Sequence, residues 1–220
     1  VIEEANSGVD KESKLLNRAI DGKYPPGSIF KTVTLAAALE NNPDIVNETF
    51  HDTGKIVFPD GTSLSNYMNQ VHGDLSLQMA YRVSSNFVFG TLAMDMGNAK
   101  LKEVAERFGF NSRINGVGLS IPQSNFPTLK EEEMGNIAQG SVLSTPIQMA
   151  IVASTVANDG VLMQPKLVNK VVDKDGNTVK EIPNKALREN VISADVANTI
   201  KEYMGYLVSN NIYRWPSFEG

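Results

Sequence analysis

A Pro-Pro-Gly turn that runs directly into an alanine-rich apolar segment constrains the fold of this chain more than any other feature. Residues 24–31 read Tyr-Pro-Pro-Gly-Ser-Ile-Phe-Lys, and residues 32–39 read Thr-Val-Thr-Leu-Ala-Ala-Ala-Leu. We expect a helix from Ser28 to about Glu40, because the residue before Pro43 avoids helical backbone angles. This predicted helix is apolar on nearly every side, so we expect a sheet to cover it, because an exposed helix of this kind would promote aggregation.

Ser28 and Lys31 both fall in the first turn of the predicted helix. Residues three apart share a helix face, so the Lys31 amine is expected beside the Ser28 hydroxyl. A lysine with a lowered pKa can take the proton of a serine nucleophile, and N–H groups at a helix N-terminus can stabilise an oxyanion. Two simpler interpretations remain: Ser28 as a helix N-cap and Lys31 as a solvated surface residue.

Composition excludes several classes of function. The 220 residues are 41% hydrophobic and 20% charged, which is ordinary for a soluble globular protein of one domain. A net charge of −5 argues against nucleic acid as a partner. The absence of cysteine excludes disulfides, a thiolate nucleophile and zinc–thiolate sites. The two histidines, His51 and His72, lie in no recognisable motif and are expected on loops or at the surface, so we predict no metal and no cofactor.

The chain carries no targeting segment that we recognise. No run reaches the roughly 18 apolar residues of a membrane span, and no signal peptide is recognisable at the start. The opening residues, Val-Ile-Glu-Glu-Ala-Asn, read as the middle of a protein, so we interpret the chain as a piece of a longer one.

The remaining pattern predicts a helix-rich α+β fold. The expected helices cover residues 28–40, 75–83, 86–96, 98–108, 131–137, 145–158 and 193–207, with a loop at 112–127. Hairpins are expected at 55–64 and 167–182, around Pro-Asp-Gly and Asp-Lys-Asp-Gly-Asn turns. Thr145 and Ser193 are expected N-caps, and Pro146 suits a first helical position. These hairpins are short and peripheral, and no set of strands would build a large central sheet.

A second polar group, Ser84-Ser85-Asn86, lies between two predicted helices. Ser84 offers a hydroxyl that can carry a proton to a leaving group, and Asn86 offers an amide that can hold a substrate. The alternative interpretation is that both residues simply cap the junction between the helices.

Four segments together resemble one family. Residues 24–31 resemble the active-site motif of penicillin-binding proteins, in the form seen in class B, monofunctional members. Residues 73–80, leading to 84–86, resemble the family's second motif and the segment before it. Residues 140–150 and 158–165 resemble the segments that follow. The resemblance runs in the family's order over about residues 16–207.

The resemblance also shows what this chain lacks. The family has a third motif, Lys-Thr-Gly or Lys-Ser-Gly, on a strand that lines the site. Asp52-Thr53-Gly54 has a different first residue and a different place in the order. The family's first two strands, expected before Ser28, are also missing. Residues 1–220 are therefore interpreted as a partial transpeptidase domain, truncated at both ends. They correspond to the predominantly helical α+β part of the penicillin-binding and serine β-lactamase-like transpeptidase fold, with most of its central sheet missing. Either another polypeptide segment supplies the missing strands, or they belong to the same protein outside these residues.

What the resemblance implies about function is specific. Family membership implies a peptidoglycan D,D-transpeptidase in which Ser28 attacks a D-Ala-D-Ala stem peptide, Lys31 accepts its proton, and Ser84 and Asn86 assist. It implies acylation by β-lactams, no cofactor, no metal and no nucleic acid. It further implies a place on the extracytoplasmic face of the bacterial membrane, with an anchor outside this chain.

Three alternatives stay open at the level of the sequence. A non-catalytic β-lactam sensor shares Ser-x-x-Lys, and a membrane-spanning signalling region elsewhere would identify it. An inactive structural or partner-binding fragment is a second alternative, which covalent penicillin labelling would exclude. A serine β-lactamase is a third alternative. The class B-like residues that precede Ser28 are not typical of those enzymes, but measured turnover of a penicillin would support it.

Overall fold

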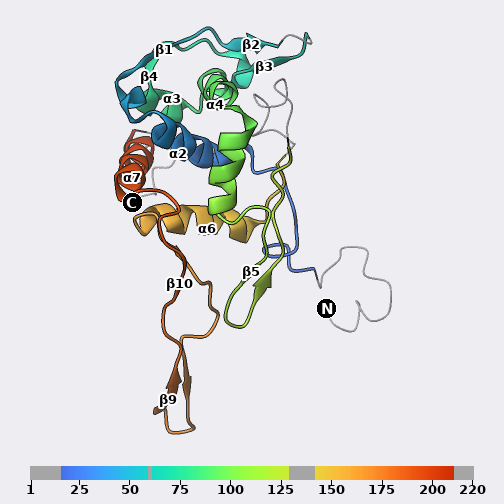
Figure 1. Ribbon diagram of the computed structural model, residues 1–220, viewed down its shortest axis with the longest axis vertical. Coiled ribbons are helices and arrows are strands. Elements are labelled where there is room, and N and C mark those ends of the chain that lie inside the picture. The colour runs from blue at the N-terminus through green and yellow to red at the C-terminus, as the bar shows by residue number, and fades with distance from the viewer. Residues whose placement is uncertain (1–15, 59–60, 129–141, 211–220) are drawn as a thin grey trace, which may run out of the picture.

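Helices packed around one central helix form the body of the molecule. The computed structural model describes residues 16–58, 61–128 and 142–210. The central helix is α2 (Lys31–Asn41), and short paired strands surround the helical body (Figure 1). This is the helix-rich α+β architecture that the sequence predicts.

The helices of the described residues agree with most of the predicted positions. The α-helices are α2, α3 (Leu77–Val83), α4 (Asn86–Arg107), α6 (Pro146–Ala157) and α7 (Ala194–Ser209), and the 3₁₀ turns are η1 (Gly27–Phe30), η2 (Pro43–Asn47) and η3 (Tyr67–Asn69). The Thr145 side chain accepts a hydrogen bond from the Gln148 N–H, and Ser193 accepts one from the Val196 N–H, so both predicted N-caps are confirmed. None of the helices in these ranges has the length and apolar character needed to cross a lipid bilayer.

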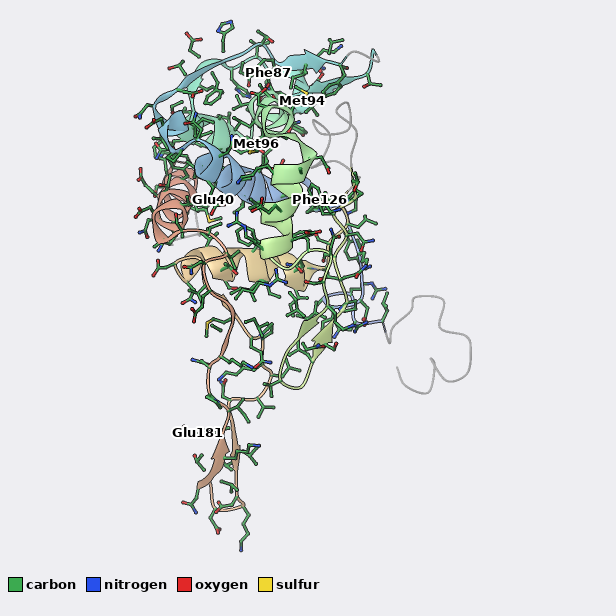
Figure 2. All side chains as sticks on the ribbon, viewed as in Figure 1. Glu40, Phe87, Met94, Met96, Phe126 and Glu181 are labelled. Atoms are coloured by element: carbon green, nitrogen blue, oxygen red, sulfur yellow. The ribbon has the colours of Figure 1, made fainter. Side chains whose placement is uncertain are left out.

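The described strands occur as two-stranded antiparallel sheets. The pairs are β1 (Thr49–Asp52) with β4 (Gly73–Ser76), β2 (Lys55–Val57) with β3 (Ser63–Ser65), β5 (Ile114–Asn115) with β6 (Ser120–Ile121), β7 (Leu162–Met163) with β10 (Ala186–Arg188), and β8 (Lys170–Val172) with β9 (Thr178–Glu181). Both predicted hairpins are confirmed, and the β8–β9 hairpin, which carries Glu181, projects away from the helical body (Figure 2). Within the described ranges no larger sheet is present, as predicted.

Helix α2 is buried by helices of this chain. Every residue from Lys31 to Leu39 is buried, and α2 packs against α4 and α7. Just before α2, the Phe30 ring meets Phe110 edge-on at 5.5 Å and stacks on Phe126 at 5.9 Å. The expectation of cover from a sheet is therefore wrong for this part of the fold, since helices of the described residues bury α2.

Two local predictions need correction, and a third is confirmed. Residues 75 and 76 belong to β4, so α3 begins only at Leu77, where Ser76 caps it by accepting the Met79 N–H. The two helices predicted at 86–96 and 98–108 are the two segments of α4, which a non-helical Gly97 with φ of 74° and ψ of 164° separates at a kink. The predicted loop at 112–127 contains β5 and β6. The helix predicted at 131–137 lies outside the described residues.

An ion pair joins the ends of two helices that pack together in the core. Arg107, in the last turn of α4, donates to the carboxylate of Glu40 near the end of α2. Both side chains are largely shielded from solvent, so this contact is stronger than a surface ion pair. It fixes the end of α2 that lies farthest from Ser28.

A matched pair of glycines tests the packing after α6. Gly160 and Gly176 have φ of 86° and 87°, but a Cβ on Gly160 would meet the Ile192 carbonyl oxygen at 2.0 Å, whereas a Cβ on Gly176 would meet nothing within 4 Å. Gly176→Ala is expected to lower the free energy of unfolding by only about 1 kcal/mol, which is the penalty for a side chain in the left-handed backbone conformation. Gly160→Ala adds a backbone clash and is expected to cost about 3 kcal/mol or more in urea denaturation. Equal losses for the two variants would contradict the described packing.

Candidate active site

The turn before α2 presents Ser28 and Lys31 on the same side. Ser28 lies in η1 and Lys31 is the first residue of α2, so the two residues are one turn apart. Neither helix start is capped by a side chain, and the Ser28 Oγ instead lies 3.4 Å from the Lys31 Nζ. The geometry thus differs from the simpler interpretation of Ser28 as an N-cap.

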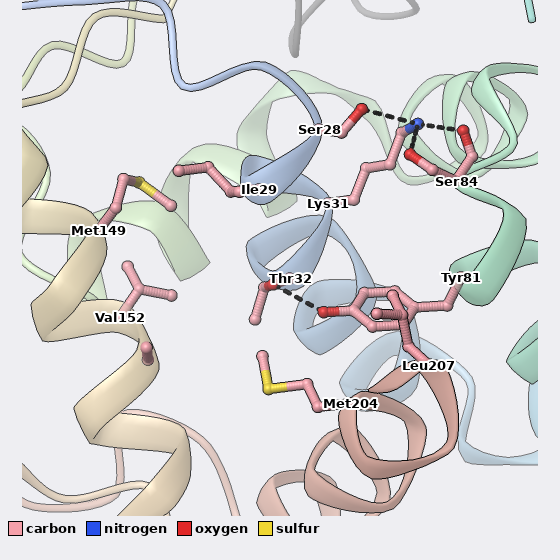
Figure 3. Close-up of a pocket in the computed structure, with 11 residues that line it drawn as sticks. Ser28, Ile29, Lys31, Thr32, Tyr81, Ser84, Met149, Val152, Met204 and Leu207 are labelled. Carbon is pink, nitrogen blue, oxygen red and sulfur yellow. Dashed lines mark hydrogen bonds between the residues drawn. The ribbon is translucent and has the colours of Figure 1, made fainter. Parts of the chain in front are cut away.

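The Lys31 amine is buried and surrounded by neutral oxygens. Only 4% of the residue is exposed. Its Nζ donates to the Ser84 carbonyl oxygen at 2.6 Å and lies 2.9 Å from the Ser84 Oγ (Figure 3). It also donates to the Asn86 Oδ1 at 2.7 Å. The Phe89 ring lies on another side, with its centroid 5.8 Å from Nζ. The interpretation of Lys31 as a solvated surface residue is therefore wrong.

Burial lowers the pKa of Lys31 from 10.5 to about 7. The cause is desolvation, because moving an ammonium out of water disfavours its charged form. None of these hydrogen-bond partners carries a negative charge that would reverse this effect. Near neutral pH the amine is thus present in both protonation states, which is the condition for a general base.

The three polar residues at the junction between α3 and α4 make different contacts. Ser85 is the N-cap of α4 and accepts the Val88 N–H at 3.0 Å. Ser84 ends α3 in the left-handed conformation, with φ of 57°, which turns both its carbonyl and its hydroxyl toward Lys31. Asn86 begins α4 and points its Oδ1 at Lys31. Ser84 is therefore also the C-cap of α3, as the alternative interpretation predicts, whereas the N-cap of α4 is Ser85, to which the sequence analysis gave no role, and not Asn86.

A largely apolar groove of about 480 Å³ opens beside these polar residues. Ser28, Lys31 and Ser84 lie at one end, and Figure 3 shows the groove continuing between α6 and α7 past Met149, Val152, Met204 and Leu207. In its wall the Thr32 and Tyr81 hydroxyls are 3.0 Å apart, and burial raises the pKa of Tyr81. A groove with a polar end and apolar walls suits an extended peptide-like ligand or another segment of polypeptide.

The histidines take no part in this arrangement. His51 lies on β1, and its side chain is mostly exposed, as predicted. Its Nδ1 lies 2.7 Å from the Asp74 Oδ1. His72 is half-buried just before β4. Within the described residues, no three His, Asp or Glu side chains converge as metal ligands would.

Comparison with known proteins identifies the family. The model of the penicillin binding protein transpeptidase domain matches residues 3–215. The chain therefore belongs to the penicillin-binding protein transpeptidase family. A peptidoglycan D,D-transpeptidase, PbpA, of Mycolicibacterium smegmatis is 35% identical over 202 residues, which are 89% of this chain and 41% of that protein.

Other relatives and solved structures agree with this assignment. The peptidoglycan D,D-transpeptidase MrdA of Escherichia coli is 29% identical over 185 residues, 77% of this chain and 29% of that protein. An imipenem acyl-enzyme of penicillin-binding protein A from M. tuberculosis superposes with a TM-score of 0.83 at 30% identity, over 92% of this chain and 48% of that one. A D,D-transpeptidase domain from Eggerthella lenta gives 0.80 at 33% identity, over 95% and 54%. The chain thus spans less than half the length of these curated relatives.

The lowered pKa of Lys31 makes a prediction about stability. Between pH 7 and 10.5 the unfolded chain binds a proton at Lys31 that the folded chain does not, so folding stability gains with rising pH. Below pH 7 the penalty for burying the ammonium is complete, and above 10.5 it is gone. Relative to Lys31→Met, the wild-type protein should gain up to about 1.4 kcal/mol of unfolding free energy per pH unit in this window.

Urea denaturation at a series of pH values measures this difference. Lys55→Met, at an exposed position on β2, controls for the general effect of removing one positive charge. A difference between wild type and Lys31→Met that stays constant from pH 7 to about 10 would contradict the burial described for Lys31.

Proposed function

We propose that the full-length protein is a peptidoglycan D,D-transpeptidase that works through an acyl-enzyme on Ser28. The observation that carries the proposal is the hydrogen bonding of Lys31. A carbonyl oxygen only accepts hydrogen bonds, so the Ser84 carbonyl and the Asn86 Oδ1 occupy both N–H groups of a neutral amine. The amine lone pair then faces the remaining neighbours, which are the Ser28 and Ser84 hydroxyls.

The first half-reaction forms the acyl-enzyme. Ser28 Oγ attacks the carbonyl carbon of the D-Ala-D-Ala peptide bond while its proton passes to the Lys31 Nζ. The N-terminus of η1 contributes N–H groups to the developing oxyanion. The C–N bond then breaks, the proton passes from Lys31 by way of the Ser84 hydroxyl to the leaving nitrogen, and D-Ala departs.

The second half-reaction reverses the roles of base and acid. The amine of a neighbouring stem peptide attacks the Ser28 ester and loses its proton to Lys31. The ester bond breaks, the Ser28 oxygen regains a proton, and a new peptide bond joins the two strands. A β-lactam enters the first half-reaction alone: its ring amide opens, the ring nitrogen takes the proton, and the ester on Ser28 persists.

The names of the relatives support this assignment. PbpA and MrdA are both named peptidoglycan D,D-transpeptidases, and penicillin-binding protein A of M. tuberculosis is described as an acyl-enzyme complex with imipenem and with penicillin G. The proposed substrates of this protein are therefore stem peptides ending in D-Ala-D-Ala, and β-lactams are its proposed inhibitors. The corresponding location is the extracytoplasmic face of the membrane, where the substrate lies, with an anchor outside residues 1–220.

The apolar groove supports a further part of the proposal, that residues 1–220 are only part of the transpeptidase domain. We propose that strands from outside these residues, including a Lys-Thr-Gly or Lys-Ser-Gly strand, lie along the groove. They would form the side of the site opposite Ser84 and Asn86. Ile29 lines the groove and is 57% exposed although it directly follows the proposed nucleophile. An apolar residue so close to a reacting serine is expected to be covered in the complete protein.

Covalent labelling tests the reaction. A fluorescent penicillin is expected to label the full-length protein, and Ser28→Ala is expected to abolish the label. Lys31→Arg keeps the positive charge but cannot act as a base, so the acylation rate should fall by about a hundredfold or more. Ser154→Ala, on the far part of α6, is the matched serine control and should label like wild type. Labelling of the wild type on a residue other than Ser28 would refute the proposed nucleophile.

Cysteine accessibility tests the covering of the groove. Residues 1–220 contain no cysteine, so in a full-length protein whose cysteines elsewhere are replaced by serine each single-cysteine variant reports one position. Ile29 and Val179 are 57% and 68% exposed here. In the full-length protein, Ile29→Cys should react with a maleimide at least about tenfold more slowly than Val179→Cys, because a covered thiol excludes the reagent. Equal rates would mean that no segment covers the groove.

A further inference from the structure

Asp52 is a buried carboxylate held by neutral partners. It is completely inaccessible to solvent at the end of β1. Its Oδ1 accepts the Gly54 N–H at 2.7 Å, its Oδ2 accepts the Ser85 hydroxyl at 2.7 Å, and the Asn66 amide donates to both oxygens at 2.9 Å. A buried charge held by neutral donors alone is costly for folding, and apolar replacements are often equally stable or better. Its presence therefore calls for an explanation other than stability.

The partners of Asp52 together satisfy the first turn of α4. Because the carboxylate only accepts, Asn66 must present its NH₂ group to it, and the Asn66 Oδ1 consequently points the other way. That oxygen accepts the N–H groups of Asn86 at 2.7 Å and Phe87 at 3.0 Å. Ser85, held by the same carboxylate, accepts the next N–H, from Val88. The negative charge of Asp52 thus lies behind the N-terminus of α4, where the helix dipole favours it.

The same bonds fix the two groups that contact Lys31. Asn86 is held by its backbone N–H on Asn66 and by its side-chain NH₂, which donates to the Ser65 carbonyl at 2.8 Å. This leaves its Oδ1 facing Lys31. Ser84 directly precedes the anchored Ser85 and keeps a left-handed conformation that a serine adopts only when its surroundings enforce it. The Asp52 carboxylate therefore supports both contacts of Lys31 indirectly: it holds Asn86 through Asn66, and it holds Ser84 through Ser85.

We propose that Asp52 is a positioning residue for the acylation of Ser28, acting through Asn66 and Ser85 to hold Ser84 and Asn86 against Lys31. The inference rests on the proposed function, because acylation is the reaction that it serves. No contact joins Asp52 directly to Lys31 or Ser28 in the described structure, so its influence passes through the two residues it holds.

The decisive variant is Asp52→Asn, together with a rescue. In either orientation the new carboxamide sets an NH₂ group against the Asn66 NH₂, because Asn66 donates to both carboxylate oxygens. Asn66→Asp alone brings two carboxylates together in a buried site and should also fail. The double variant Asp52→Asn with Asn66→Asp exchanges donor and acceptor. The amide at position 52 then donates to the carboxylate at position 66, which still accepts the N–H groups of Asn86 and Phe87 but loses the hydrogen bond that the Asn66 NH₂ donates to the Gln70 carbonyl.

Acylation of the full-length protein by a fluorescent penicillin measures the effect. Asp52→Asn and Asn66→Asp should each lower the second-order acylation rate constant by about tenfold to a hundredfold, as misplacement of reacting groups does. The double variant should recover part of this loss and acylate at least about fivefold faster than either single variant, which is positive coupling between the two positions. Gln148→Met is the control, since it breaks an equally buried hydrogen bond, to the Phe108 carbonyl, without contacting this network.

Crystal structures of the same variants provide a readout that does not need acylation. In Asp52→Asn the Asn86 Oδ1 should leave hydrogen-bonding distance of the Lys31 Nζ, beyond about 3.5 Å, and in the double variant it should return. If the wild type is not acylated on Ser28, the proposed function fails while these structures still decide the role of Asp52. An Asp52→Asn protein with Asn86 in place and wild-type acylation, or a double variant no better than either single one, would overturn the inference.

Discussion

The site depends on the burial of one amine among neutral oxygens. Lys31 opens the central helix, and the packing that buries this helix also removes water from its ammonium. Desolvation then lowers the pKa of Lys31 to about 7 without help from a neighbouring cation. A carboxylate in contact with Lys31 would have the opposite effect, and its contacts here are a backbone carbonyl, a side-chain amide and two hydroxyls. The Asp52 carboxylate does not contact Lys31 in the described structure, because its hydrogen bonds go to Asn66 and Ser85 instead.

The helical part of the fold supplies all four proposed site residues, although the strands of the family's central sheet are not part of it. Ser28, Lys31, Ser84 and Asn86 all lie at helix ends, and helices of the same chain bury the first turn of α2. What this part leaves open is the groove between α6 and α7. The side chains that we propose to take and pass a proton thus all belong to the described residues, while the wall opposite them is proposed to come from the rest of the protein.

Local features of the sequence were predictable, and long-range ones were not. The approach of Ser28 to Lys31 follows from helical spacing, and the caps at Thr145 and Ser193 follow from residue type, so both could be predicted. The arrival of Ser84 and Asn86 at Lys31, more than fifty residues later, was expected only from resemblance to a family. The buried roles of Asp52 and Asn66 carry no local signal, because they arise where β1, the segment after β3 and the start of α4 meet.

The errors have physical causes of the same kind. Residues 75–77, Leu-Ser-Leu, fit a strand or a helix equally well by pattern, and pairing of β4 with β1 decided the outcome. The break predicted between residues 96 and 98 is present, by contrast, because Gly97 adopts a non-helical conformation with φ of 74°. Ser85 was passed over because its neighbours match a catalytic pattern, although its own N-cap position could have been recognised from the helix that follows.

The account rests on the protonation state of Lys31, so the most direct test is to titrate that amine in the wild-type full-length protein. Lysines labelled with ¹³C at Cε report protonation through their NMR shift, and the Lys31 resonance is assigned by its loss in Lys31→Arg. We predict a midpoint near pH 7, well below that of an exposed lysine. A midpoint close to the ordinary value of 10.5 would show that the amine is charged at neutral pH, and would contradict its role as the base for Ser28.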